Sequence, residues 1–231
     1  MTRKVLTGNT VTRRSFLIAG AVMATGLNLG TVQRARSQSG RPLGRAKMDI
    51  DQFVHDCISA HQETDPQAAV LEVLRRAVQE PGAVIAALGE PTEAGIRVLH
   101  RSETLTIFNA TWTPQMNLMP HNHLMWANIG IYTGREDNIL WHKTPESIEA
   151  VGAKALFERD VVALPPDAIH SVTNPLPRFT GGIHIYGGDF FDTTRSQWNP
   201  ETRAEEPSDG AVIRAIFDRE NDRMQRERDR G

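Results

Sequence analysis

Cysteine is scarce in this sequence, and its scarcity excludes a disulfide-held scaffold. Cys57 is the single cysteine among 231 residues, so no disulfide can form within the chain. Internal repeats and low-complexity segments are missing too. What remains is an ordinary globular composition, 39% hydrophobic and 23% charged, at a length typical of one domain with or without appendages.

An excess of positive charge is missing as well. The net charge is -2, but the first 36 residues carry six basic side chains and no acidic one. The other residues carry 20 basic and 28 acidic side chains, a balance of about -8. A mildly acidic body argues against nucleic acid and anionic membranes as partners.

The basic N-terminus resembles a bacterial twin-arginine export signal. Residues 12–17 read Thr-Arg-Arg-Ser-Phe-Leu, and an uncharged stretch rich in Ala, Gly, Leu and Val follows over 18–33. That stretch is too short and too rich in glycine for a good membrane span. The usual Ala-x-Ala cleavage motif is absent, and Gln33-Arg34-Ala35 is the nearest candidate.

This resemblance implies a signal peptide over residues 1–36 and a linker over 37–47. The protein would then be periplasmic, with no stable membrane association after processing. Two alternatives stay open, namely a disordered basic tail, or a cytoplasmic protein whose translation starts at Met48.

The remaining sequence changes from a helical to a strand-like pattern. Helical spacing of apolar residues predicts a helical segment over 48–92. Short β-prone runs between turn signals then favour a sandwich or barrel over 93–200, and 201–231 is predicted as a helical tail. The predicted strands are 96–99, 104–112, 125–132, 139–142, 161–164, 169–172 and 183–186, and the turn signals include residues 133–138 and 164–167.

Three of the eight histidines stand out by their spacing. In a strand, residues i and i+2 point to the same face, so His121 and His123 can reach one metal ion. The preceding Met119-Pro120 would end regular strand pairing and aim the two side chains. An isolated His-x-His is a weak signal, and a second motif is needed to support it.

Residues 165–174 supply that motif, because they resemble the second conserved motif of cupins, Pro-x-Gly-x-x-His-x-x-x-Asn. Asp167 stands where glycine is usual, and Asp tolerates such a turn. The glutamate of the first cupin motif is absent. The resemblance implies a mainly β cupin double-stranded β-helix, a jelly-roll barrel with N-terminal helices and a C-terminal helix. It also implies a metal site of three neutral histidines, His121, His123 and His170. Three merely structural core histidines are the alternative.

Over residues 96–191 the sequence resembles cysteine dioxygenase and its thiol dioxygenase relatives. Trp112 precedes His121 by nine residues, and residues 182–186 are similar to the family's Ser-x-His-x-Tyr segment. The resemblance implies that Tyr186 places its hydroxyl near the iron and that His184 polarises it. Two departures leave the substrate open. Gly182 replaces the serine, and Asn128 stands where mammalian-type enzymes have a cysteine that cross-links to the tyrosine.

The family holds the substrate carboxylate with an arginine on an early strand. Arg97 is the nearest match, and Arg101 is the reserve candidate. The planar guanidinium suits this role because it binds a carboxylate bidentately, although a surface arginine is an equal alternative. Cys57 is predicted to be an apolar core residue. Residues 187–191 and 195–198 are predicted to form an ordered lid or an edge cover, with no chemistry assigned to them.

The resemblance implies an iron-dependent dioxygenase with one Fe(2+) per chain. Its substrates would be O2 and a small cysteine-like thiol, which would be oxidised to its sulfinate. The alternative is a non-catalytic metal-binding cupin that senses or stores a small acidic ligand, since one fold hosts many functions. The thiol, the metal bound in the cell and the oligomeric state stay open.

Overall fold

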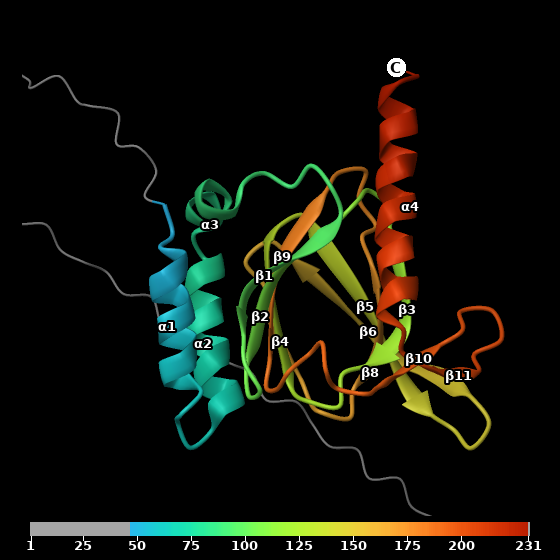
Figure 1. Cartoon of the computed structure of the whole chain (residues 1–231), viewed down its shortest axis with the longest axis horizontal. Coiled ribbons are helices and arrows are strands. Elements are labelled where there is room, and N and C mark those ends of the chain that lie inside the picture. The colour runs from blue at the N-terminus through green and yellow to red at the C-terminus, as the bar shows by residue number, and fades with distance from the viewer. Residues whose placement is uncertain (1–46, 231) are drawn as a thin grey trace, which may run out of the picture. The chain divides into compact units, whose positions relative to one another are not determined.

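The computed structural model describes residues 47–230, shown in Figure 1. The predicted signal over 1–36, and the predicted linker except for Lys47, lie outside the described residues. No helix of the described part is long and apolar enough to cross a membrane.

Three helices come first: α1 (Ile50–Ala60), α2 (Pro66–Val78) and α3 (Pro81–Leu88). The side chains of Asp49 and Asp65 accept hydrogen bonds from backbone N–H groups in the first turns of α1 and α2, which satisfies donors that have no partner inside a helix. Pro66 and Pro81 start their helices where a missing N–H costs nothing. Helices α1 and α2 therefore begin at capping aspartates, whereas α3 begins at a proline without a side-chain cap.

The strands that follow form a jelly roll. One sheet has the order β1-β2-β9-β4-β7 and the other β11-β10-β3-β8-β5-β6. Within them, β2-β9-β4-β7 and β3-β8-β5-β6 are the two four-stranded sheets of a jelly-roll barrel, which confirms the predicted fold class. The strands are β1 (Gly95–Arg101), β2 (Thr106–Trp112), β3 (Asn117–Asn122), β4 (Ala127–Thr133), β5 (Arg135–Lys143), β6 (Ile148–Phe157), β7 (Val161–Leu164), β8 (Ile169–Thr173), β9 (Thr180–Tyr186), β10 (Ser196–Trp198) and β11 (Glu205–Pro207).

The turn predicted over residues 133–138 is wrong in extent. Gly134, with a φ of 83°, makes the bend, and β5 already begins at Arg135. A positive φ suits glycine because it has no Cβ to clash. Glu136 and Asn138 are therefore strand residues, and both are buried.

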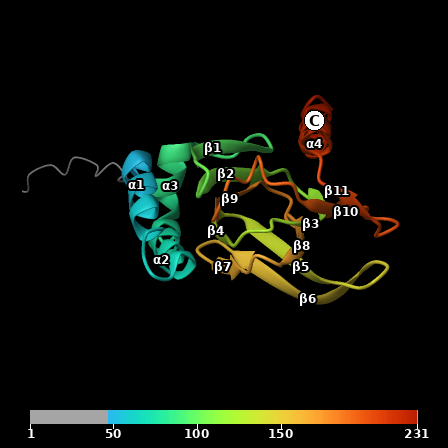
Figure 2. The same ribbon diagram turned by 60° about the horizontal axis from the view of Figure 1, so that its bottom comes forward.

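Alternation along the strands separates two apolar cores. On β9, Ile183 and Ile185 face the helices, whereas His184 and Tyr186 face the barrel interior. All of β9 is buried, because helices cover one face of its sheet and the second sheet covers the other (Figures 1 and 2).

The last helix, α4 (Gly210–Arg228), lies against the barrel away from α1 to α3 (Figure 2). Phe217 is buried and stacks on Trp112 with ring centroids 5.6 Å apart. The Asn221 side chain exchanges two hydrogen bonds with the backbone of Ala94, at 2.7 and 2.9 Å. These contacts bring Phe217 to the end of the barrel interior.

Helix α2 packs directly on β4 at Gly130, and this contact generates a stability prediction. A Cβ at Gly130 would lie 2.9 Å from Leu74 Cγ and 3.0 Å from Val78 Cγ1, two buried side chains. Gly130→Ala should therefore lower the free energy of unfolding by about 1–3 kcal/mol, as expected for overpacking. The matched control is Gly152→Ala on β6, where the nearest atom would be 4.0 Å away. Urea unfolding should show the control unchanged or slightly stabilised, and equal stabilities for the two variants would contradict the packing account.

Candidate metal centre

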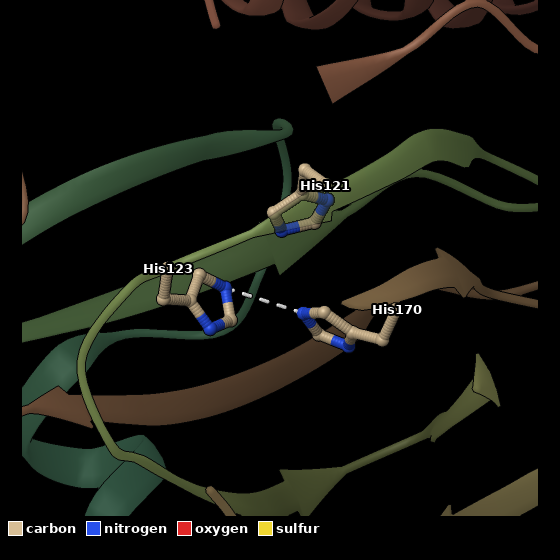
Figure 3. Close-up of side chains that lie close together, drawn as sticks. All are labelled: His121, His123 and His170. Atoms are coloured by element: carbon tan, nitrogen blue, oxygen red, sulfur yellow. Dashed lines mark hydrogen bonds between the residues drawn. The ribbon is translucent and has the colours of Figure 1, made fainter. Parts of the chain in front are cut away.

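Three histidines converge inside the barrel (Figure 3). His121 is on β3, His123 lies just beyond the end of β3, and His170 is on β8. One ring nitrogen of each lies within 4.8 Å of those of the other two, and all three side chains are buried. The structure thus brings together the three residues that the sequence motifs predict as ligands.

Strand pairing accounts for this convergence. His121 and His170 are direct partners across β3 and β8, and the register shifts between Leu118 and His121, around Pro120. Proline cannot donate a ladder hydrogen bond, so a bulge is the expected consequence. The i, i+2 spacing then brings His123 to the same side as His121.

Two of the three rings have their protonation fixed by a neighbour. The Nδ1 atom of His121 lies 2.9 Å from the carbonyl oxygen of Met119, and Nδ1 of His170 lies 2.6 Å from Oδ1 of Asn138. Both partners only accept, so each Nδ1 carries the proton and each Nε2 keeps a free lone pair. This is the usual arrangement of histidines that bind metal through Nε2.

His123 supplies a test of whether a metal fits. Its Nε2 lies 3.2 Å from Nε2 of His170, and its buried Nδ1 has no hydrogen-bond partner. Because Nε2 of His170 keeps its lone pair, either a proton on Nε2 of His123 or a shared cation must lie between the two nitrogens. The donor atoms that meet here all belong to imidazoles, with no carboxylate among them in residues 47–230. Such a set fits a divalent transition metal and is a poor site for magnesium or calcium, which prefer oxygen.

Burial keeps the three rings neutral. It lowers the pKa of His121 to about 4, and it lowers the pKa values of His123 and His170 well below the ordinary value, with neighbouring histidine charges adding to the effect. Neutral imidazole is the form that binds metal, so the site needs no proton loss at neutral pH.

The predicted acid–base pair lies beside the cluster. The Tyr186 hydroxyl is 3.3 Å from Nδ1 of His184, and the Tyr186 ring centroid is 4.9 Å from that of His123. Burial raises the pKa of Tyr186, so its hydroxyl stays protonated at neutral pH and can donate. Gly182, two residues before His184 on β9, offers His184 no polar partner.

A buried carboxylate takes that place instead. Glu136 Oε2 accepts a hydrogen bond from Nε1 of Trp112 at 2.9 Å and lies 3.4 Å from Nε2 of His184, while Oε1 accepts from Nδ2 of Asn138 at 3.1 Å. Burial alone would raise the pKa of Glu136, but His184 and these donors together hold it below the ordinary value. Sequence reasoning missed Glu136 and Asn138, although their i, i+2 spacing is the same signal that identified His121 and His123.

Two of the three clustered histidines, His121 and His170, line a small cavity of about 40 Å³. Its lining includes His121, His170, His184 and Tyr186, and also Arg195, whose role sequence reasoning missed. A second, more open cavity of about 380 Å³ adjoins this inner cavity, and we call it the outer cavity. Five side chains line both cavities: Ile96, Phe190, Arg195, Ile213 and Phe217. A larger cavity of about 780 Å³ contains none of the three histidines.

Arg195 is the cationic group of this cavity. Its guanidinium lies 3.8 Å from the Phe190 ring centroid and donates from NH1 to the Phe190 carbonyl. Its Nε is buried and has no hydrogen-bond partner. Burial lowers the pKa of Arg195, yet an arginine remains charged in proteins. A half-buried cation with an unpartnered Nε is suited to receive an anionic group.

The structure does not bring the predicted substrate arginine to the cavity. Arg97 is exposed, and its Nη1 lies 3.4 Å from the Leu88 carbonyl oxygen. Its neighbour Ile96 lines the inner cavity. Adjacent strand residues face opposite sides, so Arg97 points away from that cavity. The reserve candidate, Arg101, pairs with Asp189 at 2.9 Å.

Two further residues also lie away from the cavity. Asn128 faces α2 and donates to the Gln67 carbonyl at 2.9 Å. Cys57 is buried among apolar side chains of the helical core, where burial raises the pKa of its thiol to about 12. Cys57 therefore has the surroundings predicted for an apolar core residue.

Comparison with known proteins returns similar structures only. No protein-family model and no curated protein matches the chain. An RmlC-like cupin with a double-stranded β-helix from Methanocaldococcus jannaschii is 12% identical, over 45% of this chain and 87% of its own, with a TM-score of 0.38. A Bacillus halodurans protein is 15% identical, over 48% of this chain and 77% of its own, with a TM-score of 0.39. A cupin 2 barrel protein from Salinispora arenicola is 18% identical, over 40% of this chain and 74% of its own, with a TM-score of 0.33. The jelly-roll assignment depends on the strand order of the chain itself.

Proposed function

We propose that this protein is an iron(II) dioxygenase that oxidises a small thiol with an anionic group to its sulfinate. The observation that carries the proposal is the pair of Tyr186 and His184 beside a ligand set of three neutral imidazoles. His121, His123 and His170 would hold the iron. When bound, iron would supply the redox chemistry through which a thiolate and dioxygen react.

The neutral ligand set favours an anionic substrate. Three imidazoles bring no negative charge, so the 2+ charge of a bound ion is left for an incoming thiolate to compensate. Tyr186 is protonated and would donate a hydrogen bond into the cavity, with His184 holding the hydroxyl in place. The protein thereby supplies orientation and a proton at a fixed atom.

Arg195 is proposed to bind the anionic group of the substrate in place of Arg97. It lines both the inner and the outer cavity, so an anion that moves from the outer cavity into the inner one passes it. The inner cavity of about 40 Å³ is small for a thiol, so Arg195 and Phe190 must shift as the substrate enters. Their return would exclude water from the reacting groups.

The first prediction from the site concerns metal content. Purified protein reconstituted with iron(II) should hold about one ion per chain, and alanine at His121, His123 or His170 should each abolish binding, since a structural or catalytic site of this kind needs at least three protein ligands. Alanine at His55, His100 or His142, which lie outside the cluster, is the control and should leave the content unchanged. Full metal content in His170→Ala, measured by elemental analysis, would contradict the site.

The second prediction concerns the substrate. Iron-loaded protein should consume oxygen with cysteine or 3-mercaptopropionate faster than with cysteamine or mercaptoethanol, which lack a carboxylate. Arg195→Gln should reduce kcat/KM for the carboxylate thiols by on the order of tenfold or more, because it removes a charge-assisted hydrogen bond. Arg214→Gln is the matched control, since Arg214 lines only the outer cavity. Iron binding without oxygen uptake on any thiol would replace the dioxygenase with a metal-binding cupin that senses or stores an acidic ligand.

A further inference from the structure

Glu136 is the single acidic side chain among the buried residues of the described chain. A buried carboxylate is costly unless it is well hydrogen-bonded, so its partners indicate what keeps it there. Trp112 and Asn138 donate to it, and His184 lies within 3.4 Å. None of these three is itself a predicted metal ligand.

Asn138 connects this carboxylate to the metal site. Its amide nitrogen donates to Glu136 at 3.1 Å, and its carbonyl oxygen lies 2.6 Å from Nδ1 of His170. An amide has one accepting and one donating end, so the carboxylate decides which end faces His170. An acceptor there places the His170 proton on Nδ1 and leaves Nε2 free.

We propose that Glu136 is a positioning residue of the metal site, which holds Asn138 in the one orientation that makes His170 a ligand. The inference rests on the metal centre of the proposed function and not on its reaction. Glu136 reaches His170 only through Asn138, and it belongs to the second layer of groups around the ion, a layer that tunes ligand orientation in metalloproteins generally.

The variant Glu136→Gln tests this orientation with almost no change in shape. With its oxygen toward Trp112 and His184, the glutamine presents its NH2 group to Asn138. Asn138 must then turn its own oxygen toward residue 136 and its NH2 group toward His170. His170 would accept at Nδ1 and carry its proton on Nε2, which blocks the lone pair that binds metal.

The experiment uses the full-length chain and zinc as the probe. Competition against a chelator should show zinc binding to Glu136→Gln weakened by about 10-fold to 100-fold, as is typical of lost second-layer contacts. NMR of the histidine ring nitrogens before zinc is added should show the His170 proton on Nδ1 in the wild type and on Nε2 in the variant. Asp137→Asn is the matched control, because Asp137 is the next residue on β5 and pairs with Arg135 outside the site.

The outcomes separate this inference from the proposed function. A wild-type protein that binds no zinc overturns both. A wild type that binds zinc, with Glu136→Gln and Asp137→Asn both matching it, overturns only the role of Glu136. If Glu136→Gln does not fold, Asn138→Ala decides, because it removes the same acceptor from His170, and tight zinc binding by that variant would overturn the inference.

Discussion

His121 and His170 stand opposite each other on β3 and β8, and the other features of the site depend on that pairing. Side chains directly opposite on neighbouring strands lie close together, so the ladder itself brings two ligands into range of one ion. The bulge at Pro120 adjusts the register, and His123 joins from just beyond the strand. The jelly roll supplies the pairing, because it places β3 beside β8. Asn122 and Ile169, which also pair across these two strands, have 46 residues between them in the sequence.

Burial then imposes neutrality on the ligands and order on their surroundings. An apolar interior disfavours charged imidazole, so the three rings keep lone pairs available at neutral pH. The same interior makes an unpartnered polar atom expensive, and the Nδ1 atoms of His121 and His170 each have an acceptor. Glu136 completes the network by accepting from Trp112 and Asn138 while it contacts His184. One carboxylate thus connects to the histidine cluster through Asn138 and lies beside His184 of the proposed acid–base pair.

Periodicity made much of this arrangement predictable. Helical spacing of apolar residues predicted the helical segment that contains α1 to α3, and the His-x-His spacing together with the motif around His170 predicted the cluster. The polar run over 133–138 has the composition of a turn, but in the structure only Gly134 bends, and Glu136 faces inward. Local sequence cannot show that Glu136 will contact Trp112 and His184, because both lie far from it in the chain. Its contact with Asn138, two residues later, depends on both residues being in a strand.

The arginine predicted to bind the substrate shows a second limit. A shift of one residue along a strand reverses the face, so Ile96 rather than Arg97 reaches the cavity. Arg195 lies outside regular structure, between β9 and β10, where no periodicity predicts which way a side chain points. Only the folding of residues 187–195 over the barrel end places it beside Tyr186, whose pKa it influences. Strand β6, exposed along most of its length, lacks the hydrophobic alternation that sequence reasoning requires.

Three neutral imidazoles, from β3, its C-terminal flank and β8, are expected to bind one ion. X-ray absorption spectroscopy of the zinc-loaded chain tests it most directly, because the scattering pattern of imidazole reports the number of histidine ligands. Three imidazole nitrogens should lie at about 2.0–2.1 Å from zinc, with only non-protein ligands completing the shell. A shell with fewer than three imidazoles, or one that contains a protein carboxylate or the Cys57 sulfur, would contradict it.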